Sequence, residues 1–204
     1  MKNKQLLRNE YKLKINMQEK NMLKVYITDL SCYNKGFLIG EWISLPMSDD
    51  ELSESIDKIL LGGEAICAIE YGYEKHEEYF ITDWEWEDIE MFKIEEYSNV
   101  FTLNKQLQLI EDQASNKQKE IAFLLNEGYA NNVEDALCKV DDVIVYENQS
   151  MKDIAFNLMD ELYGVDYKLP PIIANNIDYD GIAYELEISG NYTIVLDDII
   201  EYIG

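Results

Sequence analysis

Residues 25–46, VYITDLSCYNKGFLIGEWISLP, set the pattern from which the rest of the chain can be interpreted. Two runs rich in β-branched and aromatic residues, 25–30 and 37–45, flank the sequence Tyr-Asn-Lys-Gly at positions 33–36. Short apolar runs separated by a glycine-containing turn sequence are typical of a β-hairpin. Pro46 lacks the N–H that a strand interior needs, so it marks the end of the second strand. We therefore expect an antiparallel pair of strands here.

A helix and two more strands are predicted after the hairpin. Ser48 and Glu51 have the spacing of a capping box, and apolar residues follow them at helical intervals. The pair Gly62-Gly63 predicts the end of this helix, because glycine is unfavourable in a helix interior. Apolar and aromatic runs at 65–73 and 79–84 then predict two strands.

The chain is predicted to have an α+β fold made of three small consecutive domains. Residues 25–98 form the first α+β domain, and 1–24 precede it as a polar, basic and mobile arm. Residues 99–142 carry apolar residues at helical spacing and predict a small helical domain. Residues 143–204 mix both patterns and predict a second α+β domain. The helices expected in the last two domains cover 103–112, 117–126, 133–140, a segment capped by Ser150 and Asp153, and a short segment from Pro170; strands are expected from Val143 and over 192–196.

The net charge of −24 is the strongest compositional signal. Residues 1–24 hold seven bases and two acids, a net of +5, so residues 25–204 hold ten bases and 39 acids, a net of −29. Duplex DNA carries one charge per ~1.7 Å, so such a charge corresponds to roughly 50 Å of duplex. A compact body of this length has a diameter of about 40 Å. A folded surface of that charge density repels nucleic acid and attracts cationic partners.

Composition also limits the class of protein. With 47% apolar residues, the chain has the material for a hydrophobic core, so the acids belong to a folded surface. Cys32, Cys67 and Cys138 are odd in number and widely spaced, which argues against a disulfide framework or a CxxC metal site and favours a reducing cytoplasm. No apolar stretch reaches the ~20 residues of a membrane span. The basic N-terminus lacks the apolar core of a secretory signal.

The sequence offers little catalytic chemistry. Its one histidine, His76, lies among Lys75, Glu77 and Glu78 and is expected to be a solvated surface residue. A lone histidine leaves few schemes that need an imidazole base or ligand. The glycine-rich nucleotide-binding signatures and the serine-hydrolase signature do not occur. We therefore expect no enzyme activity, no cofactor and no metal site.

One motif suggests an alternative, a calcium-binding module. The twelve residues from Asn176 to Glu187 carry acids at the third and fifth positions, Asp178 and Asp180, as an EF-hand loop does. Asparagine replaces the usual aspartate at the first position, and the prolines just upstream leave little room for an incoming helix. The motif therefore also fits a structural turn with solvated acids, and both interpretations remain open.

Three segments, in order along the chain, resemble the ArdA family of antirestriction proteins. The first is 25–46, with its Tyr-Asn-x-Gly turn, Gly-x-Trp strand and closing proline. The second is EYFITDWE at 78–85, and the third joins NIDY at 176–179 to AYELEISG at 183–190. The third departs from the family pattern, because IAYEL at 182–186 lacks the arginine that members usually carry.

The resemblance implies a DNA mimic that occupies the DNA-binding channel of type I restriction-modification enzymes. It also implies an elongated arrangement of the three domains, a homodimer, and carriage by a mobile genetic element. Within the C-terminal antirestriction-like segment it points to Asn176, Asp178, Tyr179, Tyr184 and Leu186.

The charge supplies a mechanism for such mimicry. Carboxylates at phosphate-like density would displace the counterions of a cationic channel, and preorganised acids lose less entropy on binding than a flexible tail. The expected partner is the methyltransferase core or the full type I complex, with neither nucleic acid nor membrane bound. An acidic protein that sequesters another DNA-binding protein remains an alternative. The acids expected to imitate phosphates lie in both terminal domains: Glu70, Glu74, Glu77, Glu78, Asp83, Glu85, Glu87, Asp88, Glu90, Asp178, Asp180, Glu185 and Glu187.

Overall fold

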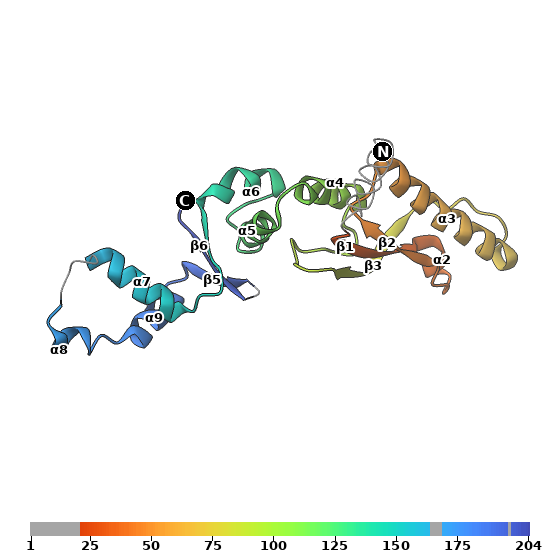
Figure 1. The fold of residues 1–204 in the computed structure, drawn as a ribbon. Helices are drawn as coiled ribbons and strands as arrows, with labels where there is room; N and C mark the ends of the chain where they lie inside the picture. Colours follow the sequence, from red (N-terminus) through yellow and green to blue (C-terminus); the bar gives the residue numbers. More distant parts are fainter. Residues whose placement is uncertain (1–20, 164–168, 196) are drawn as a thin grey trace, which may run out of the picture. The chain divides into compact units, whose positions relative to one another are not determined.

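The computed structural model describes residues 21–163, 169–195 and 197–204 (Figure 1). The chain divides into two compact units between Ala114 and Ser115. Each unit contains helices and one three-stranded antiparallel sheet, which agrees with the expected mixture of helices and strands. The expected helical middle is shared between the units, and the division into three domains stays a prediction. The expected basic arm lies, up to residue 20, outside the described residues.

The first sheet contains the two strands expected from the opening stretch. β1 (Leu23–Asp29) pairs antiparallel with β2 (Gly40–Leu45), and β3 (Tyr79–Trp86) pairs with the other edge of β1. The strand pairing is therefore confirmed. The connection is longer than a tight turn, because the one-turn helix α2 (Leu30–Asn34) follows β1 directly.

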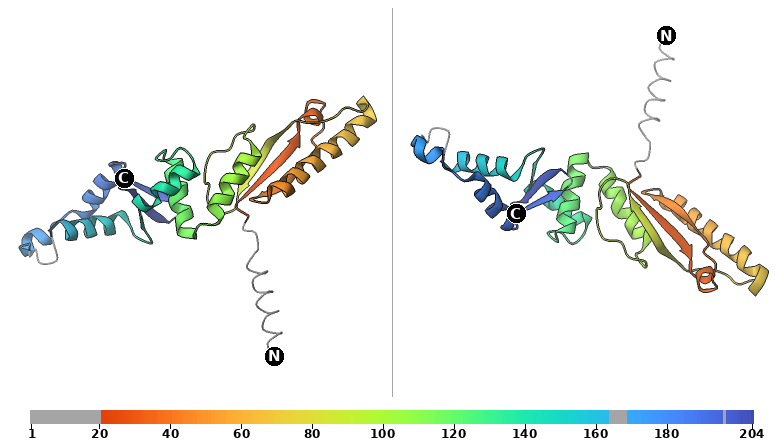
Figure 2. Two further views of the ribbon diagram at one scale, coloured as in Figure 1. Left: turned by 90° about the horizontal axis from the view of Figure 1, so that it is seen from above. Right: turned by 90° about the horizontal axis from the view of Figure 1, so that it is seen from below.

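The long helix α3 (Asp49–Tyr71) contradicts the predicted stop at Gly62-Gly63 and the predicted strand at 65–73. The helix begins as expected, with the full capping box between Ser48 and Glu51. It continues through the two glycines because its apolar face stays buried against the sheet as far as Cys67. Figure 2 shows α3 lying alongside the strands.

On α4 (Val100–Glu111), the side chain of Asn104 forms hydrogen bonds with the segment between β2 and α3. The backbone N–H of Met47 donates to Asn104 Oδ1, and Asn104 Nδ2 donates to the Met47 carbonyl, both at 2.9 Å. Asn104 is fully buried, so these hydrogen bonds satisfy its polar atoms away from water. The predicted inward face of this helix, with Leu103, Leu107 and Ile110, is confirmed as buried.

The second unit is built from short elements around a smaller sheet. The predicted helices over 117–126 and 133–140, the helix after Ser150, the short helix near Pro170 and the strand from Val143 are confirmed to within a few residues. Near the end of α7, Leu162 is 65% exposed, although its spacing from the buried Ile154 is helical. The elements in order are α5 (Ser115–Asn126), α6 (Val133–Lys139), η1 (Val140–Asp142), β4 (Val143–Tyr146), α7 (Met151–Tyr163), α8 (Pro171–Ala174), α9 (Tyr179–Ile188), β5 (Tyr192–Val195) and β6 (Asp198–Tyr202).

The central strand of the second sheet, β6, is not predicted from the sequence pattern. The strand order is β4-β6-β5, and Ile199 and Ile200 of β6 are buried. The nearly buried carboxylate of Asp198 at the start of β6 pairs with Lys119 on α5. This ion pair and a hydrogen bond from the backbone N–H of Asn148 hold the pKa of Asp198 below its ordinary value. The ion pair with Lys119 thus offsets the free-energy cost of burying the carboxylate of Asp198.

Candidate functional site

All thirteen acids expected to imitate phosphates are solvent-exposed. Nine lie between residues 70 and 90 in the first unit, and four belong to α9 or its N-cap in the second. The nine follow the outer edge of the first sheet, because β3 is an edge strand. Glu70 lies near the end of α3; Glu74, Glu77 and Glu78 precede β3; Asp83 and Glu85 are on β3; Glu87, Asp88 and Glu90 follow it.

The charge along β3 has a density that can be compared with DNA. The eight residues of β3 span about 26 Å at the usual rise per residue. One strand of DNA carries one phosphate per 3.4 Å, which gives about eight over that length. Only Asp83 and Glu85 lie on β3 itself, about a quarter of that number, and the other seven acids extend beyond its two ends.

Three of these acids are held in place by lysines. The Nζ of Lys35, the C-cap of α2, lies 2.6 Å from Glu74 Oε2, and the Nζ of Lys75 lies 2.6 Å from Glu77 Oε1. Lys35 lowers the pKa of Glu74, and Lys75 lowers the pKa of Glu77, in each case chiefly through the hydrogen bond. Lys24 on β1 pairs with Glu87 beyond the other end of β3. These contacts restrict the carboxylates but also cancel part of their charge.

The face of the first sheet that is turned away from α3 carries an open aromatic groove. Tyr26 lies between Trp42 and Asp83 in the strand register, and the Tyr26 and Trp42 rings meet edge to face at 5.4 Å. Trp42 is 48% exposed. Asp83 was expected here from the sequence, whereas its aromatic neighbours were not. The groove is lined by Tyr26, Tyr33, Leu38, Trp42, Phe80, Thr82, Asp83 and Glu96.

In the second unit, the acids share the helix α9, which packs against α7. Asp178 is the N-cap and accepts a hydrogen bond from the Gly181 N–H at 2.9 Å. Asp180, Tyr184 and Glu187 recur at four- and three-residue intervals and share one exposed face. The remaining residues of the antirestriction-like segment are the exposed Asn176, Glu185 on α9, and Tyr179 and Leu186, which are half-buried.

The helix α9 contradicts the alternative of an EF-hand calcium loop. Such a loop needs twelve residues of irregular backbone that turn their oxygens toward one ion. Here residues 179–187 are helical, and the carboxylate of Asp178 caps that helix. Asp180 pairs with Lys152 on α7 at 2.9 Å. Asp178 and Asp180, which suggested calcium binding, therefore belong to the beginning of a helix.

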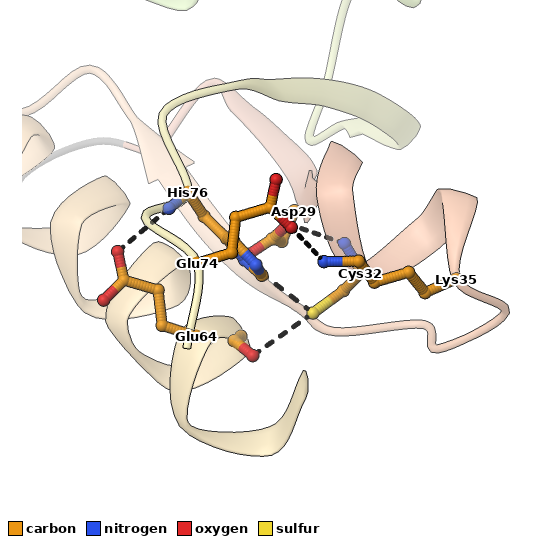
Figure 3. Close-up of polar contacts among 7 residues, drawn as sticks. Asp29, Cys32, Lys35, Glu64, Glu74 and His76 are labelled. Carbon is orange, nitrogen blue, oxygen red and sulfur yellow. Dashed lines mark hydrogen bonds and ion pairs between the residues drawn. The ribbon is translucent and has the colours of Figure 1, made fainter. Parts of the chain in front are cut away.

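His76 is the clearest departure from the sequence prediction. It was expected on the surface, but it is 3% exposed and its Nδ1 lies 2.6 Å from Oδ2 of the fully buried Asp29 (Figure 3). Its backbone N–H donates to the buried Glu64 on α3 at 2.9 Å. Cys32 Sγ lies 4.0 Å from the same ring nitrogen. The two carboxylates that bond to this histidine, Asp29 and Glu64, lie 47 and 12 residues away in the sequence, so no local pattern predicts these contacts.

This buried cluster does not have the geometry of a Cys-His-Asp catalytic triad. In a triad the nucleophile and the acid contact different ring nitrogens of the histidine. Here both Cys32 and Asp29 approach Nδ1. Burial, a hydrogen bond with Cys67 and the charge of Asp29 raise the pKa of the Cys32 thiol to about 12. A buried neutral thiol is a poor nucleophile.

A comparison with protein-family models gives a match over residues 25–201, to the model described as antirestriction protein (ArdA). The match covers most of the chain and runs through both units. The chain belongs to the ArdA family. The family implies an antirestriction function and an interaction with restriction enzymes, as inhibitors rather than as enzymes. The search of curated proteins gave no match.

The segments that carry the resemblance to ArdA proteins have separate places in the fold. The opening stretch forms the β1–β2 pair, EYFITDWE includes most of β3, and the C-terminal segment forms α9 and its cap. The segments that resemble the family thus lie on the three strands of the first sheet and on α9 with its cap. Among the described residues, no helix combines the length and apolar character needed to cross a membrane.

Proposed function

We propose that this ArdA-family protein inhibits type I restriction-modification enzymes by imitating duplex DNA in their DNA-binding channel. The observation that carries the proposal is the exposure of all thirteen expected phosphate-mimicking acids, in a chain whose family has an antirestriction function. The net charge of −24 leaves few surfaces of this protein attractive to nucleic acid itself. Its natural partners are cationic clefts.

Six of the thirteen acids lie on a helix or a strand and the other seven flank these elements, which favours tight binding. A carboxylate on a strand or helix loses less conformational entropy on docking than one on a disordered tail. Entry into a channel lined by lysine and arginine releases the anions that otherwise neutralise that channel, as phosphate contacts release cations from DNA. The inhibition should therefore weaken as salt increases.

The aromatic groove gives the acidic edge a means of holding individual cationic side chains. Asp83 lies beside Tyr26, whose neighbour on the other side is Trp42, so a guanidinium or ammonium group could meet a carboxylate and the face of a ring together. Arginine in particular stacks on aromatic rings while it pairs with acids. The groove therefore suits the residues that line a DNA-binding channel.

The proposal also includes the finer features that the family resemblance implies. These are competition with DNA at the methyltransferase core, action in the cytoplasm, carriage by a mobile element, a homodimer, and three small domains in an elongated arrangement. Light scattering tests the dimer, and small-angle X-ray scattering tests the arrangement.

The proposal is tested with a purified type I enzyme and its substrate DNA. We expect the protein to block cleavage and to co-purify with the methyltransferase core, with a potency that falls as salt is raised. A matched assay with a type II endonuclease controls for a general effect of added polyanion. Capture of a different DNA-binding protein from host lysate, without inhibition of the type I enzyme, would instead support sequestration of another partner.

A further inference from the structure

We propose that Cys32, Cys67 and His76, together with Asp29, form a structural zinc site in the first unit. The thiols and the ring nitrogen offer three ligand atoms that all lie within 4.8 Å of one another, and all three residues are buried. They come from α2, from α3 and from the segment before β3. The proposal is independent of the antirestriction function.

The distances in the cluster are close to those of a tetrahedral zinc site. Zinc binds thiolate sulfur at about 2.3 Å and imidazole nitrogen at about 2.0 Å, which places neighbouring ligand atoms about 3.5 Å apart. Cys32 Sγ lies 4.0 Å from His76 Nδ1. An inward movement of less than an ångström by each side chain would therefore suffice.

The fourth ligand would be Asp29, which contacts the histidine but is not among the three residues whose ligand atoms all lie within 4.8 Å of one another. Its Oδ2 lies 2.6 Å from His76 Nδ1, which is a hydrogen-bond distance with a proton between the two atoms. Zinc would take the place of that proton at Nδ1, the neutral imidazole would carry its one ring proton on Nε2, and the two protons released to the buffer would come from the two thiols. Oδ1 of Asp29 still accepts from the Cys32 backbone N–H at 2.9 Å, which keeps the carboxylate oriented.

The surroundings of the cluster are shaped to bring these groups together. Gly63 lies in the middle of α3, and a Cβ there would clash with Asp29 Oδ2 and would stand 3.1 Å from Cys32 Sγ. Only glycine allows the helix to approach this closely. Glu64 accepts the backbone N–H of His76 and so fixes the segment that carries the histidine. Figure 3 shows Asp29 and Cys32 beside the imidazole of His76 and Glu64 at the backbone N–H of the same residue.

The chemistry of the ligands selects the metal. Two thiolates and an imidazole favour zinc over calcium and magnesium, which prefer oxygen ligands. A site closed to solvent and with four protein ligands is of the structural type. His76 lies between Glu74 and Glu77, so the ion would also fix the backbone that carries these acids.

The test uses the full chain, kept reduced, freed of metal with a chelator, and then titrated with Zn²⁺ or Co²⁺. We expect one equivalent of metal per chain, and for Co²⁺ both thiolate-to-metal charge-transfer absorption and the visible bands of tetrahedral cobalt. The variants C32S and C67S should lose the charge-transfer absorption in part, and D29N should bind at least tenfold more weakly. C138S alters the exposed cysteine of α6 and serves as the matched control, with unchanged binding.

The wild-type protein alone can overturn the proposal, whatever the folding of the variants. Absence of metal binding, or a cobalt spectrum without thiolate charge transfer, would contradict it. Equal loss of absorption in C138S and C32S would also contradict it, because the metal would then be held by exposed thiols. Circular dichroism of each variant shows whether the loss of binding accompanies loss of fold.

Discussion

The two acidic regions of this protein hold their charge in different ways. In the first unit the acids follow an edge strand and its flanking segments, and Glu74, Glu77 and Glu87 pair with lysines. In the second unit they lie on one ten-residue helix, with Asp178 capping it and Asp180 paired to Lys152. The strand gives a line of charge, whereas the helix gives a face.

Two equally exposed acidic regions can thus be held in place by different kinds of interaction. The first region depends on tertiary structure, because the segment before β3 is held by the buried cluster around His76 and by Lys35. The second depends mainly on local structure, because α9 carries its own cap and an exposed face at helical spacing. Substitutions that disturb packing should therefore affect the first region more than the second.

The largest effect is expected from removing charge in each region. The triple variants E70Q/E85Q/D88N and D180N/E185Q/E187Q should each weaken inhibition of the type I enzyme, and should lower the slope of log affinity against log salt by up to about 0.9 per charge. The triple variant D50N/E54Q/D57N on the exposed side of α3 removes the same charge elsewhere. Equal weakening by all three would show that net charge, and not its placement, controls inhibition.

The dependence of the first region on packing can be tested at two adjacent glycines of α3. Gly63→Ala should destabilise the unit by about 2 kcal/mol, because the new methyl group meets Asp29 and Cys32. Gly62→Ala has open space around it and should stabilise by about 0.5–1 kcal/mol through helix propensity. Denaturant unfolding of both variants measures the difference. Similar stability changes would mean that the close approach of α3 is not maintained in solution.

An intermediate effect is expected from Asp198, which supports the second sheet. Folding lowers its pKa from the ordinary value of 3.8, chiefly through Lys119. The resulting stability is therefore present above pH 3.8 and is lost as the pH falls through the lower, folded value. Asp198→Asn should be less stable than wild type at pH 7, and the two should converge in acid. A constant difference in unfolding midpoint across this range would contradict the ion pair.

The smallest effect is expected at the cap of α9. Asp178→Ala should reduce stability by about 1 kcal/mol, because the Gly181 N–H loses its acceptor. Asp178→Asn keeps an acceptor and removes only the charge. Unfolding should separate the two variants, whereas inhibition should fall for both if the charge itself contacts the enzyme. Equal stability of the two variants would show that the cap contributes nothing.

Local sequence patterns predicted those elements whose stability is local. The capping box of α3, the β-branched run of β1 and the amphipathic face of α4 all fold as their spacing indicates. The exposure of the thirteen acids could also be predicted, because carboxylates seldom lie in protein cores.

The errors occurred where distant contacts override local preference. Glycine at Gly62-Gly63 costs helix stability, but burial of the helix face outweighs that cost. His76 looked solvated because its partners, Asp29 and Glu64, are remote in sequence. The spacing of Asp178 and Asp180 fits both a calcium-binding loop and the beginning of a helix, and only the backbone conformation distinguishes the two.

The most direct test of the account measures whether the protein displaces DNA from a type I methyltransferase core. A fluorescent duplex bound to the core is titrated with the wild-type protein at about 50 mM and at about 200 mM salt, a range over which phosphate-like contacts weaken strongly. We predict full displacement at low salt and a steep loss of apparent affinity at high salt. Failure to displace the duplex, or displacement that is equally tight at both salt concentrations, would contradict DNA mimicry by these acids.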